Sequence, residues 1–148
     1  MKPQTSLSLL IVLVIFVLGG IWLIRNQQDQ EPTQVFPATI QRDCAPWDGS
    51  AFTVSVPLEQ SAIRISIYRS PDIGLPVTFS FPDETMREGS ASLLTPTGMP
   101  DPLTGTVRFQ RVDVGKPVEG RFSLRSESGE SFTGRFVAEW RNEIILCG

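Results

Sequence analysis

The sequence contains no histidine, and among its 148 residues there are only two cysteines and two lysines. Without histidine the chain lacks the commonest general base, the commonest metal ligand and the usual near-neutral pH switch. Its carboxylates are scattered among predicted turns, and its serines have no histidine to activate them. Lys2 and Lys116 are isolated in the sequence, and an exposed lysine is a weak nucleophile. We therefore expect a protein that is not an enzyme and that holds no metal or other cofactor.

Strongly basic segments are also lacking. The formal net charge is −3, and positive residues are spread along the chain. Binding to a phosphate backbone needs clustered positive charge, so we expect no nucleic acid among the partners.

The most apolar part of the chain is residues 9–24, which include no charged side chain. A bilayer core needs roughly 20 mainly apolar residues in a helix, and the run with its flanking serines approaches that length. Trp22 and Arg25 lie at its far end, where an aromatic ring and a snorkelling cation suit the headgroup region. We therefore predict that residues 6–24 form a transmembrane anchor helix within the lipid bilayer, after a short cytoplasmic N-terminus at residues 1–5.

A cleaved signal peptide is the alternative interpretation of this run. Such peptides have an apolar region of about 7 to 15 residues and end in a small-x-small site. Here bulky residues occupy the place of that site, and a lipoprotein signal would need a cysteine where Ile21 stands. We favour an uncleaved anchor. Lys2 before the run and the acidic residues Asp29 and Glu31 after it favour a cytoplasmic N-terminus.

These features together predict a single-pass protein of a bacterial inner membrane. The C-terminal domain would then be periplasmic or extracellular. The bacterial origin rests on the small size of the chain and on the absence of any Asn-x-Ser/Thr acceptor.

The two cysteines, Cys44 and Cys147, stand at opposite ends of the region expected to fold. They lack the Cys-x-x-Cys spacing of a redox motif, and two sulfurs without histidine make a poor zinc site. In an oxidising compartment we expect a disulfide between them. It would close a loop of about 100 residues, for which chain entropy gives at most about 4.7 kcal/mol of stabilisation.

Residues 25–43 are polar, rich in glutamine and interrupted by two prolines. Such a segment has little material for a core, so we predict a stalk that joins the anchor to a domain at residues 44–148. Val35, Phe36 and Ile40 are apolar exceptions that are candidates to pack on the edge of the domain.

Alternation of apolar and polar residues dominates the rest of the chain. It runs through residues 52–58, 63–67 and 75–81, and it recurs in the segments that begin at Gly105, Gly120 and Gly134. This period is typical of antiparallel strands with one face on a core. We therefore predict an all-β domain, an antiparallel β-sandwich of seven to eight strands, with a small closed barrel as the alternative.

One hairpin can be predicted residue by residue. The loop Glu127-Ser128-Gly129 suits a three-residue hairpin turn with Gly129 in the left-handed conformation. This turn sets three pairs opposite one another: Leu124 with Phe132, Phe122 with Gly134, and Gly120 with Phe136. Each strand glycine would then lie under a phenylalanine, which compensates for its missing side chain.

Three groups of residues are candidates for function. The segment 83–104 has the weakest periodicity, and we interpret it as a long loop around a short strand near residues 91–94. Its apolar residues would form an adaptable partner surface, or Leu93 and Leu94 would instead cap the core. The candidate interaction residues in this loop are Met86, Leu93, Leu94, Met99 and Leu103.

The other two groups are an aromatic residue and a row of cations. Trp47 either packs over the disulfide or stacks on a ligand. Arg108, Arg121 and Arg135 are predicted on the outward face of neighbouring strands. They form either a solvated, salt-bridged surface or a contact with an acidic partner or anionic headgroups.

The sequence therefore predicts a non-enzymatic, membrane-anchored interaction or scaffolding module whose partner is a membrane or periplasmic protein. The alternative is a small-ligand or lipid-binding module with a site between the sheets. A filled core would favour the first hypothesis, and an open apolar cavity of several hundred Å³ would favour the second.

Overall fold

The computed structural model describes residues 34–148 apart from residues 75, 86, 97, 144 and 148. The predicted cytoplasmic N-terminus, the anchor and the first part of the stalk lie outside these residues. In the part of the chain that is described, no helix has the length and apolar character needed to cross a membrane.

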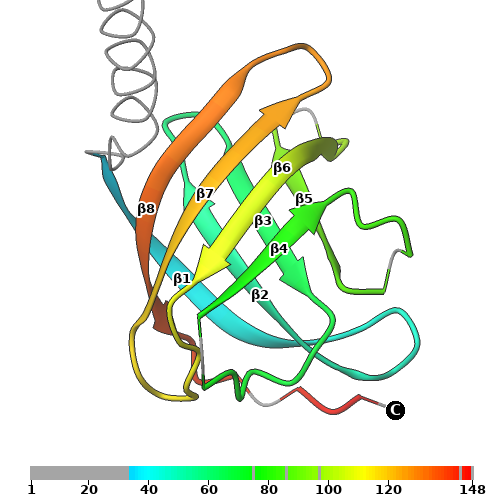
Figure 1. Ribbon diagram of the computed structural model, residues 1–148, viewed down its shortest axis with the longest axis vertical. Helices are drawn as coiled ribbons and strands as arrows, with labels where there is room; N and C mark the ends of the chain where they lie inside the picture. Colours follow the sequence, from blue (N-terminus) through cyan, green and yellow to red (C-terminus); the bar gives the residue numbers. More distant parts are fainter. Residues whose placement is uncertain (1–33, 75, 86, 97, 144, 148) are drawn as a thin grey trace, which may run out of the picture. The chain divides into compact units, whose positions relative to one another are not determined.

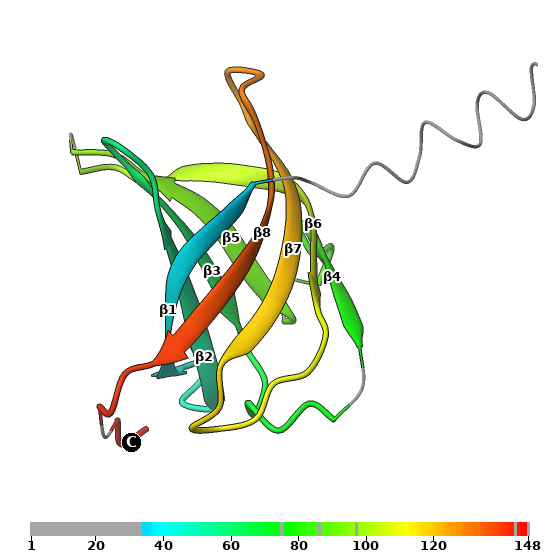
Figure 2. The same ribbon diagram turned by 90° about the vertical axis from the view of Figure 1, so that its left-hand side faces the viewer.

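Eight strands make up the described domain (Figure 1). They are β1 (Val35–Cys44), β2 (Ser50–Pro57), β3 (Ala62–Ile67), β4 (Val77–Phe81), β5 (Gly89–Leu94), β6 (Asp101–Phe109), β7 (Val118–Ser126) and β8 (Ser131–Trp140). The sheet order is β4-β6-β5-β3-β2-β1-β8-β7, and β6 also pairs with β7. Seven strands thus close into a barrel, and β4 lies outside the ring as an additional strand on β6 (Figure 2).

The ring closes where the first and last strands of the chain meet. β1 and β8 are parallel, whereas every other pair of neighbours in the described ring is antiparallel. In a closed ring with an odd number of strands, the strand direction cannot alternate at every pair of neighbours, so one pair must be parallel. Here that pair is β1 and β8, which we call the seam. The sandwich prediction is therefore wrong, and the alternative, a small closed barrel, is confirmed. Alternation shows that each strand has one buried face, but it does not show whether the edges of the sheet meet.

Strand β1 begins inside the segment predicted to be a stalk. Ala38 and Ile40 are buried, and Phe36 packs against the core. The stalk prediction is therefore wrong over residues 35–43, which belong to the barrel wall. Polar residues on the outward face of β1 conceal the period-two pattern of its inward apolar residues. The composition of this segment therefore indicated the wrong start for the folded domain.

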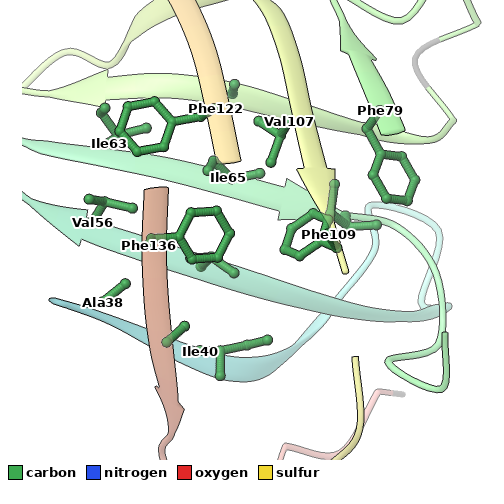
Figure 3. Packing of buried hydrophobic residues seen from close by; sticks show 14 of the residues in the cluster. Ala38, Ile40, Val56, Ile63, Ile65, Phe79, Val107, Phe109, Phe122 and Phe136 are labelled. Atoms are coloured by element: carbon green, nitrogen blue, oxygen red, sulfur yellow. The ribbon is translucent and has the colours of Figure 1, made fainter. Parts of the chain in front are cut away.

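Aromatic side chains fill the barrel (Figure 3). Phe109 lies at the centre, and its ring meets Phe52, Phe79 and Phe136 edge-on at centroid distances of 5.6, 5.9 and 5.7 Å. Such edge-to-face pairs each add about 0.5–1.5 kcal/mol beyond the burial of their surface. Aliphatic residues of β2 and β3 complete the core: Val54, Val56, Ile63, Ile65 and Ile67.

The β7–β8 hairpin has the predicted register. Gly129 has φ +91°, and the Ser126 N–H donates to the Glu130 carbonyl at 2.9 Å. The three predicted cross-strand pairs are all present: Leu124 with Phe132, Phe122 with Gly134, and Gly120 with Phe136. A Cβ on Gly120 would collide with the Phe136 ring, which therefore covers this glycine as expected.

A second glycine determines where the barrel wall divides. The first residues of β6 pair with β5, as in Leu93 opposite Asp101, but Gly105 lies opposite Phe81 of β4. Gly105 has φ +130°, and a Cβ there would collide with the carbonyl oxygen of Ser123 on β7. Both observations require glycine at the point where β6 exchanges one neighbour for another.

The disulfide between Cys44 and Cys147 is present, with a Cα–Cα distance of 5.6 Å. Because β1 and β8 are parallel, both end on the same side of the barrel. The seven residues after Trp140 then bring Cys147 to the end of β1. The bridge locks the seam at which the ring closes.

We predict that Gly105→Ala lowers the free energy of unfolding by roughly 2–4 kcal/mol, through backbone strain and collision with β7. Urea denaturation would measure the loss. Gly115→Ala is the matched control, because Gly115 has φ +80° but open space around it. It should lose only about 1–2 kcal/mol. Equal losses in the two variants would contradict the assigned role of Gly105.

We predict that the double variant Cys44→Ser/Cys147→Ser loses roughly 2–4 kcal/mol of unfolding free energy, because the unfolded chain regains the entropy of a long loop. Denaturation of the wild type with and without reductant provides the control. The reduced wild type should unfold at the same urea concentration as the double variant. Coincident curves for the oxidised wild type and the variant would refute the prediction.

Candidate functional site

A pocket of about 410 Å³ opens where β5 separates from β6 and β4 takes its place. We call it the wedge pocket. Its buried lining includes Phe81 at the end of β4, Ala91 of β5 and Leu103 of β6. Trp47, Tyr68 and Pro82 are more exposed members of the same lining. The space exists because β4 and β5 lie on the same edge of β6 but do not pair with each other (Figure 1).

Two aromatic side chains stand together at this pocket. The rings of Trp47 and Tyr68 meet edge-on at 5.4 Å, and Trp47 remains 50% exposed. A tight turn presents Trp47, with the Ala45 N–H donating to the Gly49 carbonyl at 2.8 Å. The Tyr68 hydroxyl lies 3.2 Å from Ser90 Oγ of β5. A half-exposed indole held this way offers a flat apolar surface to a ligand.

One side of the wedge pocket is a strand edge. β5 pairs with β3 from Gly89 to Leu94, but its pairing with β6 is limited to Ser92 and Leu93. Within the described registers, residues 89–91 therefore have a strand neighbour on one side only. The unpaired backbone groups of such an edge can bind another extended chain. Here they lie within the wedge pocket, where Gly89 and Ala91 are buried and Ser90 is exposed.

The loop between β4 and β5 is organised by Asp83. One carboxylate oxygen accepts hydrogen bonds from the N–H groups of Arg87 and Glu88, both at 2.7 Å, and the other accepts from the Thr85 N–H at 3.1 Å. Hydrogen bonds from Glu88 and Thr85 hold the pKa of Asp83 at about 2, below its ordinary value of 3.8. The Glu88 carbonyl in turn accepts from the Tyr68 N–H at 2.9 Å. The ionised Asp83 thus fixes one wall of the wedge pocket.

The residues of the predicted interaction loop do not form one surface. Leu93 and Leu103 are buried, Leu94 is half-buried, and Met99 is 83% exposed. Met86 lies outside the described residues. The predicted short strand is present as β5, which buries alternate residues because successive side chains of a strand point to opposite faces of the sheet. Of the five residues, Leu103 lines the wedge pocket.

The predicted arginine row is present. Arg108 of β6 lies opposite Arg121 of β7, which lies opposite Arg135 of β8. A carboxylate oxygen of Glu119 lies 4.0 Å from a guanidinium nitrogen of Arg135. The row is on the outer surface of the barrel, apart from the wedge pocket.

Trp47 is the predicted ligand contact that the structure places in the pocket. Its expected packing over the disulfide stays a prediction, since the contact observed is with Tyr68. Tyr68, Phe81 and Pro82 were not among the sequence candidates. Tyr68 is the single tyrosine of the chain, and it follows a strand directly. Nothing in the local sequence marks Phe81 and Pro82 as pocket residues. They line the pocket only because β6 changes its neighbour from β5 to β4 near Gly105.

A second depression, of about 360 Å³, lies at the seam end of the barrel and includes Arg42, Trp140 and Glu143. Nearby, hydrogen bonds from Lys116 and Arg111 lower the pKa of Asp113. The Trp140 indole N–H donates to the Asp113 carbonyl at 2.8 Å, which anchors this loop to β8. Among the described residues, no three histidine, cysteine, aspartate or glutamate side chains gather as a metal site would require.

Comparison of the chain with protein-family models, with curated proteins and with solved structures found no match. We therefore infer the function from the geometry of the wedge pocket and its surroundings.

We predict that Asp83→Asn destabilises the protein at neutral pH and that its deficit shrinks as the pH falls. Asp83 has a folded pKa below its unfolded value, so its contribution is present above about pH 4 and is lost as the pH falls toward 2. Urea denaturation of both proteins at several pH values between 5 and 2 would measure this. If the difference in unfolding free energy between the wild type and Asp83→Asn stayed constant from pH 5 to pH 2, the prediction would be contradicted.

Proposed function

We propose that the protein is a non-enzymatic binding module, anchored in a bacterial inner membrane, that holds an extended segment of a periplasmic or membrane protein in the wedge pocket. The observation that carries this proposal is the edge of β5 at residues 89–91, which has no pairing partner in the described registers and lies beside an apolar, aromatic pocket. Backbone pairing along residues 89–91 would provide affinity, and contacts with Trp47 and Tyr68 would provide selectivity.

The chemistry of the pocket defines the segment it would accept. Apolar groups dominate the lining, including Pro46, Pro82 and Pro102. Prolines and half-exposed aromatic rings form surfaces that take apolar or proline-containing extended chains with little loss of entropy. The carboxylate of Asp83 is already satisfied by the hydrogen bonds of its own loop, so it is not available as a strong partner for a ligand cation.

A small apolar ligand is the second candidate, and the size of the pocket favours it. Its volume of about 410 Å³ falls within the roughly 300–1,000 Å³ of small-molecule sites. The core itself is filled by phenylalanines, so such a ligand would enter at the division of the wall and not between two sheets.

Membrane anchoring supports either function by concentrating the module at one surface. Tethering converts a weak encounter with a membrane partner into an intramolecular event with a high effective concentration. A disulfide-locked barrel suits an oxidising compartment, in which the bridge persists.

A selection experiment tests the proposal. Short random peptides displayed on phage would be selected against the full chain in phosphatidylcholine nanodiscs. We expect enrichment of extended apolar or proline-containing sequences, and Trp47→Ala should raise the Kd of their synthetic peptides about tenfold or more. Met99→Ala is the matched control, because it removes a strongly exposed apolar side chain that does not line the pocket.

The other outcomes discriminate between the candidates. Binding of anilinonaphthalene sulfonate that depends on Trp47, without peptide enrichment, would favour the small-ligand function. Peptides that bind equally well to the Trp47→Ala and wild-type proteins would place the site elsewhere and refute the proposal.

A further inference from the structure

The second depression of the structure lies at the end of the barrel where β1 and β8 stop, and we call it the mouth pocket. Arg42 of β1, Trp140 of β8, the loop between β6 and β7 and the C-terminal segment surround it (Figure 1). Its volume of about 360 Å³ falls within the roughly 300–1,000 Å³ of small-molecule sites, and such sites commonly lie in the mouths of β-barrels.

Arg42 occupies an inward position of β1 at the point where the core ends. Residues two apart on a strand point to the same face, and Ala38 and Ile40 pack in the core (Figure 3). Arg42 follows them on that face and lies opposite the buried Phe52 of β2. Its side chain is nevertheless exposed, because it lines the mouth pocket. The inward face of β1 thus ends in a cation at the mouth.

Trp140 gives the mouth pocket an apolar wall that is fixed in place. The ring is half-buried, and its N–H donates to the Asp113 carbonyl at 2.8 Å. The only hydrogen-bond donor of the ring is thereby satisfied, which leaves the indole for apolar contact. The Asp113 carboxylate pairs with Arg111 and Lys116 at 2.9 and 3.1 Å. These pairs order the loop that carries Val114, an apolar member of the lining.

The C-terminal segment forms another wall of the mouth pocket. The Arg141 N–H donates to the Ile40 carbonyl at 2.8 Å, and the disulfide between Cys44 and Cys147 holds the far end of the segment. The segment is therefore tied at both ends, which keeps Arg141 and Glu143 at the pocket.

In the described part of the chain, the guanidinium groups of Arg42 and Arg141 form no ion pair and no hydrogen bond. Glu143 is the one carboxylate of the described lining, and it does not approach either group within ion-pair distance. The lining therefore has one more positive charge than negative charge. Guanidinium groups bind carboxylates in bidentate fashion, and attraction is stronger in a partly enclosed apolar site than in open water.

We propose that the mouth pocket binds a small carboxylate that carries an apolar ring or chain. The carboxylate would accept hydrogen bonds from Arg42 and Arg141, and the apolar part would lie against Trp140 and Val114. This inference goes beyond the proposed function, since it depends neither on what the wedge pocket binds nor on the anchor.

Fluorine NMR of the full chain in a neutral detergent, labelled with 5-fluorotryptophan, tests the proposal. The chain has three tryptophans, and the variants Trp22→Phe and Trp47→Phe identify the resonance of Trp140. Benzoate is the probe, and benzamide is the control because it has a similar size but no charge. Benzoate should shift the Trp140 resonance with a Kd at least about fivefold below that of benzamide. The Trp47 resonance, which reports on the wedge pocket, should not move.

Charge variants provide the second measurement. Arg42→Gln should raise the Kd of benzoate at least about fivefold. Arg64→Gln is the matched control, because it removes the same charge from an exposed residue of β3 outside the mouth pocket, and it should leave the Kd nearly unchanged. Glu143→Gln should lower the Kd, since it removes a negative charge from the lining. Should Arg42→Gln fail to fold, Glu143→Gln and the comparison of benzoate with benzamide decide the question.

Four results would overturn the proposal. Equal affinity for benzoate and benzamide would show an apolar site in which the arginines take no part. A shift of the Trp140 resonance by benzylammonium that Glu143→Gln abolishes would assign the pocket to cations. A benzoate shift of Trp47 and not of Trp140 would place carboxylate binding in the wedge pocket. The last is an unmoved Trp140 resonance at about 50 mM benzoate, a concentration that would nearly saturate a site of millimolar Kd.

Discussion

The parallel contact between β1 and β8 is the constraint on which the rest of the structure depends. A closed ring of seven strands cannot alternate in direction throughout, so one pair must be parallel, and the pair formed is that of the chain's two terminal strands. Parallel strands end on the same side, which brings Cys147 to Cys44. The same pairing sets the entry of the chain beside Arg135, at the end of the arginine row. The disulfide is thus a consequence of how the ring closes.

The site follows from a departure from that regular ring. β6 is paired with β5 over its first residues and with β4 after Gly105, so the wall divides. The division leaves a pocket lined mainly by apolar side chains. Asp83 and the turn that carries Trp47 organise the two sides of the opening. The pairing of β6 with two successive neighbours therefore creates the wedge pocket, and hydrogen bonds within the two adjoining turns hold its sides in place.

Features that depend on neighbours in sequence could be predicted, and features that depend on closure could not. The β7–β8 register followed from one turn and the need to cover Gly120, and this register also sets Arg121 opposite Arg135. The cysteine pair could be assigned because the chain offers no other partner. β1 was assigned to the stalk, because its polar residues and Pro37 conceal the alternation of its three inward apolar residues, Phe36, Ala38 and Ile40. Tyr68 and Phe81 line the same pocket only because of the order in which the strands pair. No pattern of neighbouring residues in the sequence predicts that order.

The ring also has a consequence in time. Of the described strands, the two that meet at the seam are the first and last to be synthesised, so β1 has no partner across the seam until nearly the whole domain has been made. Contacts so distant in sequence form slowly, and until they form the growing sheet has an open edge able to associate with other chains. The protein is thus most vulnerable to aggregation before the ring can close.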